Sequence, residues 1–121
     1  MLLYHGTKSD RVDGILANGF DDRYFKNDGE FGHGAYFADD PSKSHVFTDK
    51  QEVLQVILFT KVLMGKMFIV DGNLKPSTTT MNSAKIGYDS TKGKARTPQP
   101  EYVVYRSAQA LPYYKITYIH P

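Results

Sequence analysis

Tyr36 and Phe47 are two aromatic residues that flank an expected helix start, with the hydroxyl of Ser44 between them in the sequence. If a strand over 36–38 and a helix over 42–47 fold back on each other, the two rings form a slot with Ser44 at its edge. Such a slot suits a flat, polar and preferably cationic ring, because the face of an aromatic ring attracts positive charge. For this segment taken alone, a buried strand followed by an amphipathic helix remains the alternative interpretation.

A second group of polar residues follows an apolar strand near the start of the sequence. His5, Gly6 and Thr7 end that strand, and the missing side chain of Gly6 leaves backbone groups uncovered. Glu101 opens another apolar strand much later in the chain. Taken alone, His5 is interpreted as a hydrogen-bonded structural histidine and Glu101 as a solvated strand end, so neither predicts catalysis by itself.

The elements that must position these residues are short. Asp40 and Pro41 have the side chains of a helix N-cap and a first helical position. Ser9 is expected to cap an earlier helix that ends at Gly19, with its apolar face on Val12, Ile15 and Leu16. Strands are expected over 2–4, 36–38, 52–64, 67–70, 84–89, 101–105 and 113–119. We predict an α+β domain in which two small, mostly antiparallel sheets pack together, with short helices on their flanks.

Composition sets the class of protein. A chain of 121 residues is enough for one domain, and without cysteine it forms no disulfide, which fits a reducing compartment. No apolar run reaches membrane-spanning length, and the first residues are too few for a signal peptide. We therefore expect an intracellular protein of the cytoplasm or nucleus that does not act at a membrane.

Two loops and the histidines bear on metals and partners. Residues 21–31 mix acids with aromatics but lack the ligand order of a calcium loop, so a flap over a ligand is the better interpretation. Four histidines without paired spacing, and no cysteine, predict no metal site. The long stretch 74–100 is basic, and its side chains could contact phosphates or remain solvated: Lys85, Lys92, Lys94 and Arg96.

Four motifs occur in order along nearly the whole chain. They are Leu-Leu-Tyr-His-Gly-Thr at 2–7, Gly-His-Gly-Ala-Tyr-Phe-Ala-Asp at 32–39 with Ser-Lys-Ser at 42–44, Gly-Tyr-Asp-Ser at 87–90, and Pro-Glu-Tyr-Val-Val-Tyr at 100–105 with Ala-Gln-Ala-Leu-Pro at 108–112. Together they resemble the catalytic domain of the poly(ADP-ribose) polymerases. Each motif alone is a weak signal, whereas four of them in this order are specific. The resemblance implies an ADP-ribosyltransferase-like fold with an NAD cleft.

The resemblance also implies a reaction. Members of this family transfer ADP-ribose from NAD+ to an acceptor and release nicotinamide, with NAD+ as substrate and no permanently bound cofactor. Their His-Tyr-Glu triad falls on His5, Tyr36 and Glu101. By resemblance, His5 holds the adenosine ribose, Tyr36 stacks on the nicotinamide ring, and Glu101 bonds the 2′-hydroxyl of the nicotinamide ribose.

The same motifs assign the remaining contacts to the substrate. Gly6 would bind the carboxamide through its backbone and Ser44 through its hydroxyl. Phe47 takes the second stacking position, where the family usually has tyrosine. The motif positions further imply NAD-binding roles for Thr7, Phe37 and Ala38, and an acceptor-side role for Lys43.

The chain also departs from the family pattern. Family catalytic domains usually carry further strands and a helix before the histidine motif, and the DNA-break-sensing members add a helical regulatory domain. We therefore expect residues 1–121 to be a single minimal catalytic domain without that regulatory domain, with a fragment cut from a longer protein as the alternative. The loop after Phe20 resembles the mono-ADP-ribosylating branch, yet Glu101 is retained, so chain elongation remains chemically open.

Three functions follow as hypotheses. The first is transfer of ADP-ribose to protein side chains. The second is the same chemistry on terminal phosphates or bases of RNA or DNA, with the basic residues of 74–100 as the contact surface. The third is a catalytically silent module that binds NAD or ADP-ribose, which an intact triad disfavours. An RNA 2′-phosphotransferase would need arginines at a phosphate site, and none of the four arginines lies in a recognised motif.

Overall fold

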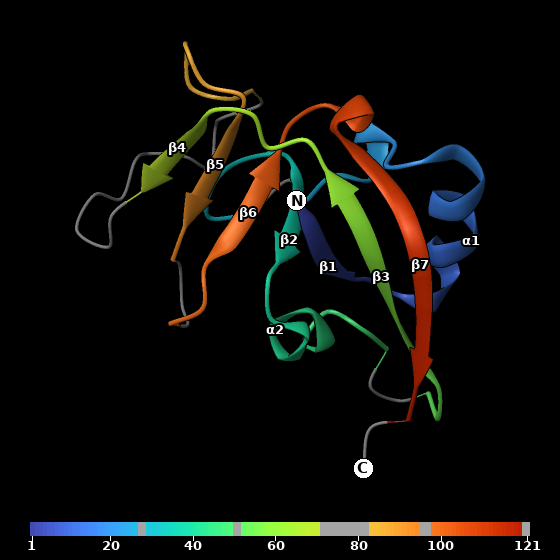
Figure 1. Ribbon diagram of the computed structural model, residues 1–121. Helices are drawn as coiled ribbons and strands as arrows, with labels where there is room; N and C mark the ends of the chain where they lie inside the picture. Colours follow the sequence, from blue (N-terminus) through green and yellow to red (C-terminus); the bar gives the residue numbers. More distant parts are fainter. Residues whose placement is uncertain (27–28, 50–51, 71–82, 95–97, 120–121) are drawn as a thin grey trace.

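One twisted sheet forms the framework of the protein (Figure 1). In the computed structural model, the described residues are 1–26, 29–49, 52–70, 83–94 and 98–119. Their seven strands lie in the order β4-β5-β6-β2-β1-β3-β7, and every neighbouring pair is antiparallel except β4 with β5. The strands are β1 Leu2–Gly6, β2 Ala35–Ala38, β3 Gln55–Val62, β4 Met67–Val70, β5 Ser90–Gly93, β6 Glu101–Val104 and β7 Ala110–Tyr118.

β1 joins the two halves of this sheet. It pairs with β2 on one edge, where Tyr4 faces Ala38, and with β3 on the other, where His5 faces Leu58. A short apolar strand in the interior of a sheet satisfies its backbone hydrogen-bonding groups by pairing on both sides. The α+β class is confirmed, whereas the prediction of two packed sheets is wrong for the described strands, because this double pairing makes them one sheet.

Two α-helices lie beside the sheet, and α2 contacts β1, β2 and β3. α2 spans Pro41–His45, and the side chain of Asp40 accepts a hydrogen bond from the Ser42 amide at 2.9 Å, as expected for its N-cap. α2 ends two residues before the expected end at Phe47. The start of this helix, which follows β2 directly, was therefore predicted correctly.

α1 spans Ser9–Asn18 and ends at Gly19, whose φ of 78° suits a glycine C-cap. Its N-cap residue is Lys8, which makes no side-chain cap, so the expected capping role of Ser9 is wrong. Instead, the carboxylate of Asp49 accepts from both the Ser9 amide at 2.7 Å and the Ser9 hydroxyl at 2.6 Å. A residue distant in sequence therefore caps α1.

Two strand predictions fail for identifiable reasons. No strand forms over 84–89, because the chain turns there and β5 begins one residue later, parallel to β4. β7 begins earlier than expected and lies at the edge of the sheet. Tyr113 is 55% exposed and Tyr114 is 60% exposed, so the half-buried alternation expected for this strand is wrong.

The core packs on the central strands. β3 is covered on both faces as predicted, with Leu58 and Val62 fully buried and only Lys61 exposed. α1 contributes Val12 and Ile15 to the core, whereas Leu16, expected on the same face, is 44% exposed. Other members of the main cluster include Leu3, Phe20, Phe25, Phe37, Tyr102 and Val104. Among the described residues, no helix is long and apolar enough to cross a membrane.

Candidate active site

His5 sits near the end of β1, with its ring held by β2. Its Nδ1 lies 2.7 Å from the backbone oxygen of Tyr36. A carbonyl oxygen only accepts, so Nδ1 carries the proton and donates it. Burial lowers the pKa of His5 below 6.5, the Tyr36 carbonyl opposes this, and the charge of Arg11 adds to the lowering. Near neutral pH the ring is therefore neutral, and its Nε2 is an acceptor for a hydroxyl.

Tyr36, on β2, is fixed at its hydroxyl end by the turn that precedes the strand. The hydroxyl donates to the Gly32 oxygen at 2.7 Å and accepts from the Phe31 amide at 2.9 Å. A side chain at Gly29 would meet this hydroxyl at 2.2 Å, so glycine is needed there. Burial is the main cause that raises the pKa of Tyr36, which keeps the phenol neutral. The ring is thereby held in one orientation.

Gly6 and Ser44 touch through their backbones. A Cβ built on Gly6 would lie 1.7 Å from the backbone oxygen of Ser44, which no side chain could tolerate. The end of β1 and α2 therefore approach more closely than any other residue at position 6 would permit. The two residues that the resemblance assigns to one amide group are thus neighbours in space.

Glu101 begins β6, directly opposite Ala38 of β2, and is 8% exposed. Lys43 of α2, equally buried, places its Nζ 3.9 Å from Glu101 Oε1 and donates to the Gln99 oxygen at 3.0 Å. The buried carboxylate of Glu101 on β6 and the buried ammonium of Lys43 on α2 therefore face each other. Neither charge is free to turn to solvent, since isolation of either would be costly.

A cavity of about 670 Å³ opens along this region. Of the predicted site residues, its lining includes His5, Gly6, Thr7, Tyr36 and Phe47. The other predicted residues do not line it and are buried around it: Phe37, Ala38, Lys43, Ser44 and Glu101. The ring of Phe37 packs on those of His5 and Phe20 at 5.3 Å between centroids, so its side chain serves the core.

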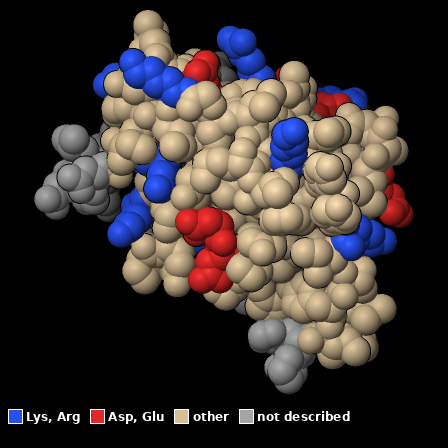
Figure 2. Space-filling model, viewed as in Figure 1, with Lys and Arg blue, Asp and Glu red and all other residues tan. Residues whose placement is uncertain are grey.

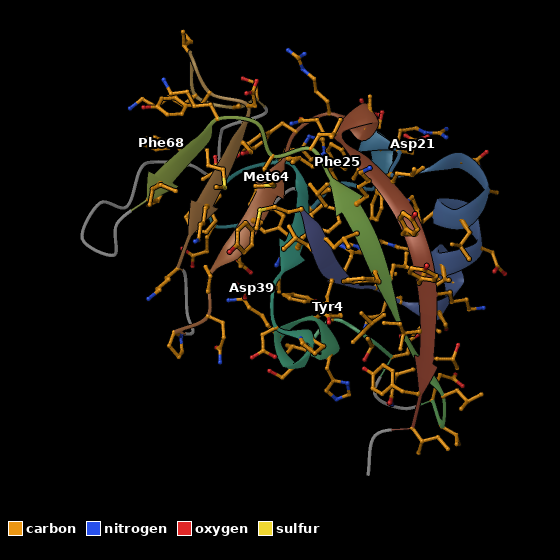
Figure 3. All side chains as sticks on the ribbon, viewed as in Figure 1. Tyr4, Asp21, Phe25, Asp39, Met64 and Phe68 are labelled. Atoms are coloured by element: carbon orange, nitrogen blue, oxygen red, sulfur yellow. The ribbon has the colours of Figure 1, made fainter. Side chains whose placement is uncertain are left out.

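The cavity also contains residues that sequence reasoning missed. Three cationic side chains line it, from Lys8, Arg11 and Lys26, with Asp21 and Phe25 nearby. Figure 3 labels Asp21 and Phe25, which lie next to the short helix η1 (Asp22–Tyr24). Hydrogen bonds from Arg23 lower the pKa of Asp21 to about 2. The mixture of charges and aromatics in 21–31 was the available signal, and the expected flap does border a cavity.

Lys26 occupies the space by the two aromatic rings. Its Nζ lies 4.8 Å from the centre of the Phe47 ring and 5.7 Å from that of Tyr36. The Lys26 amide donates to the Gly34 oxygen at 3.1 Å, which pairs this loop with the glycine turn before β2. Tyr36 and Phe47 therefore lie close enough for one ammonium group to contact both rings. The slot itself stays a prediction.

The basic residues of 74–100 lie elsewhere. Figure 2 shows Lys and Arg gathered toward the side of the molecule where β4 and β5 lie. Lys85 lies 4.3 Å above the ring of Phe68, which Figure 3 labels on β4, and Lys92 lies 5.2 Å above that of Tyr102. Arg96 lies outside the described residues. Within the described part of the chain, no group of His, Asp and Glu could hold a metal ion.

Comparisons with known proteins identify the family to which the chain is similar. The family model described as "Poly(ADP-ribose) polymerase catalytic domain" matches residues 1–100. Similar curated proteins include "Protein mono-ADP-ribosyltransferase PARP12" of Mus musculus, 28% identical over 117 residues that make up 96% of this chain and 16% of that protein. "Poly [ADP-ribose] polymerase 1" of Oryza sativa subsp. japonica is 31% identical over 93% of this chain and 12% of its own length.

A third relative, "Protein mono-ADP-ribosyltransferase PARP10" of Mus musculus, is 29% identical over 96% of this chain. The alignments span only 12–16% of the length of these curated relatives. The family model, in contrast, covers most of this chain, and its match includes both the His5 and the Tyr36 motifs. The chain therefore belongs to the poly(ADP-ribose) polymerase catalytic domain family.

Proposed function

We propose that this protein transfers ADP-ribose from NAD+ to an acceptor and releases nicotinamide, with NAD+ as substrate and no resident cofactor. The observation that carries the proposal is the arrangement of His5, Tyr36 and Glu101. They stand on the neighbouring strands β1, β2 and β6, and His5 and Tyr36 line the cavity, whereas Glu101 is buried and does not line it. The proposal is supported because three residue types that the family's chemistry requires stand on neighbouring strands.

We assign the substrate contacts from the resemblance to the family. His5 Nε2 accepts a hydrogen bond from a hydroxyl of the adenosine ribose, because Nδ1 already donates a hydrogen bond to the Tyr36 carbonyl. The nicotinamide ring stacks between Tyr36 and Phe47, with its carboxamide on the Gly6 backbone and the Ser44 hydroxyl. Thr7 lines the cavity beside them, and Phe37 and Ala38 support the site from within β2.

Glu101 carries the chemical step in this proposal. The bond between the anomeric carbon and the nicotinamide nitrogen breaks, and its electron pair leaves with nicotinamide. The sugar then resembles an oxocarbenium ion, which a carboxylate bonded to the 2′-hydroxyl stabilises. The acceptor atom bonds to the anomeric carbon and gives up its proton, for which Glu101 is the available base. Lys43 fixes the carboxylate from α2, and its acceptor-side role stays a prediction.

We propose protein side chains as the acceptor. Two of the similar proteins carry the name protein mono-ADP-ribosyltransferase, and a third is named a poly(ADP-ribose) polymerase. The retained Glu101 is compatible with either product length.

The decisive experiment incubates the protein with NAD+ labelled in its adenylate part, together with protein or 5′-phosphorylated RNA and DNA acceptors. We expect the label on protein with the wild type, and about a 100-fold slower transfer with Glu101→Gln, which keeps the shape but removes the charge. Affinity for NAD+ should change little. Glu52→Gln is the matched control, because Glu52 is exposed and does not line the cavity.

Two outcomes would contradict the proposal. If NAD+ binds but nicotinamide is never released, the protein is a binding module. If Glu101→Gln loses NAD+ binding and turnover equally while its melting temperature is unchanged, Glu101 is a binding residue and the assigned role is wrong.

A further inference from the structure

The aromatic slot of the free protein already contains a positive charge. The Lys26 ammonium lies over both the Phe47 and the Tyr36 rings, at 4.8 Å and 5.7 Å from their centres. Both distances are within the range in which the face of an aromatic ring attracts a cation. All three residues line the same cavity. The Lys26 side chain thus lies where a flat cationic ring would have to bind.

The backbone holds Lys26 at this place. Its amide donates to the Gly34 oxygen at 3.1 Å, and next to this bridge the rings of Phe25 and His33 meet edge to face at 5.6 Å. None of the described residues forms an ion pair with Lys26. The contacts with the two rings are therefore the interactions that the structure gives its ammonium group.

We propose that Lys26 is the resident cation of the slot. Its ammonium group separates the rings of Tyr36 and Phe47, and it has to leave before the nicotinamide ring of NAD+ can enter. The proposal rests on the function proposed above. The pyridinium ring of NAD+ is itself positively charged, so the two cations cannot share the slot. The apparent affinity for NAD+ is then the intrinsic affinity multiplied by the fraction of molecules in which Lys26 has left the slot.

This assigns Lys26 a part in substrate affinity and none in the chemical step. The released nicotinamide also has to compete with the returning ammonium for the slot, so Lys26 favours the departure of nicotinamide after each turnover. Removal of the ammonium should therefore lower the KM for NAD+ without changing kcat, as expected for a group that affects binding of the ground state and of the transition state equally.

The test uses Lys26→Ala and Lys26→Arg. Since Lys26 is exposed, truncation should leave the melting temperature unchanged. We expect Lys26→Ala to lower both the KM for NAD+ and the dissociation constant of free nicotinamide by about fivefold, the factor expected for loss of one cation–π contact. The kcat should stay within about twofold. Lys26→Arg keeps a cation and should behave as the wild type.

Lys85→Ala is the matched control, because Lys85 lies over the ring of Phe68 at 4.3 Å and does not line this cavity. It should change neither constant. An unchanged or weaker affinity for nicotinamide and NAD+ in Lys26→Ala would overturn the inference, since Lys26 would then be inert or a ligand contact. If the wild type neither binds nicotinamide nor releases it from NAD+, the proposed function fails, which is a different result from equal binding by wild type and variant.

Discussion

At the scale of single residues, the site depends on polar groups whose protonation is fixed by their neighbours. Tyr36 is neutral because burial raises its pKa, and its hydroxyl is bonded on both sides. His5 is neutral because burial shifts its pKa in the opposite direction, below the usual value for histidine. A ligand therefore meets one acceptor nitrogen at His5 and a fixed aromatic face at Tyr36. The side chains of His5 and Tyr36 are therefore already oriented before substrate binds, whereas Lys26 has to leave the face of Tyr36.

The lowered pKa of His5 predicts a pH dependence of stability. In the unfolded chain histidine binds a proton near pH 6.5, whereas folded His5 does so only at lower pH. The unfolded state therefore holds more protons in this window, and the free energy of unfolding falls as pH drops from about 6.5 toward the folded pKa. The contribution is fully present above that window, and its slope is at most about 1.4 kcal/mol per pH unit.

Urea unfolding at about pH 7, 6 and 5 measures this dependence. His5→Gln should flatten the profile, and the partly buried His33, changed to Gln, serves as the control. The aspartates with lowered pKa, among them Asp21 at about 2, act below this range. A wild-type profile that stays level between pH 7 and 5, or a slope that persists in His5→Gln, would show that His5 is not the responsible group.

Sequence reasoning placed individual residues where local types or family motifs specify them. The glycines of the 32–39 motif meet local demands of this kind, since Gly32 has a φ of 91° and a Cβ at Gly34 would lie 2.7 Å from the Val104 backbone oxygen. The pairing of Lys43 with Glu101 was not predicted, because it joins α2 to β6 across the fold. Lys26 was missed for the same reason, since only the folded loop brings it to Tyr36.

At the scale of elements, the junction between β1 and α2 is the critical contact. Gly6 leaves no room for a Cβ, which would lie 1.7 Å from the Ser44 backbone oxygen. We expect Gly6→Ala to lower the free energy of unfolding by about 1–3 kcal/mol, as overpacking against rigid backbone does. Urea unfolding measures this, and NAD+ binding should weaken at the same time because Gly6 lines the cavity.

Gly14→Ala provides the opposite case within the same protein. Gly14 lies inside α1, and a Cβ there would meet nothing within 4 Å. Alanine should therefore stabilise the helix by about 0.5–1 kcal/mol. Equal effects of the two substitutions would contradict the assignment of a steric role to Gly6.

Elements were predictable where their limits are written locally. The Asp40 cap, the Gly19 end of α1 and the apolar run of β3 depend on neighbouring residues, and these predictions were confirmed. The single sheet was not foreseen, because it depends on which distant strands β1 pairs with. The position of β5 was wrong for a similar reason: its pairing with β4 and β6 selects residues 90–93 in place of 84–89.

At the scale of the whole molecule, charge bears on the choice of acceptor. The formal net charge is only +2. Lys85 and Lys92 already lie over aromatic rings of the chain itself, on the side of β4 and β5. Neither of them lines the cavity beside His5 and Tyr36. Lys85 and Lys92 therefore give a nucleic acid no basic contact inside this cavity.

This arrangement predicts weak salt dependence of transfer. An acceptor held by six or more phosphate contacts would lose about 10³- to 10⁵-fold in affinity between about 50 and 200 mM salt, whereas a protein acceptor held by mixed contacts loses far less. We expect transfer to protein to change by less than about threefold over this range. Replacement of Lys85, Lys92 and Lys94 by Gln should leave it unaltered. Efficient transfer to 5′-phosphorylated RNA that collapses with salt and with this triple variant would instead assign the basic surface to acceptor binding.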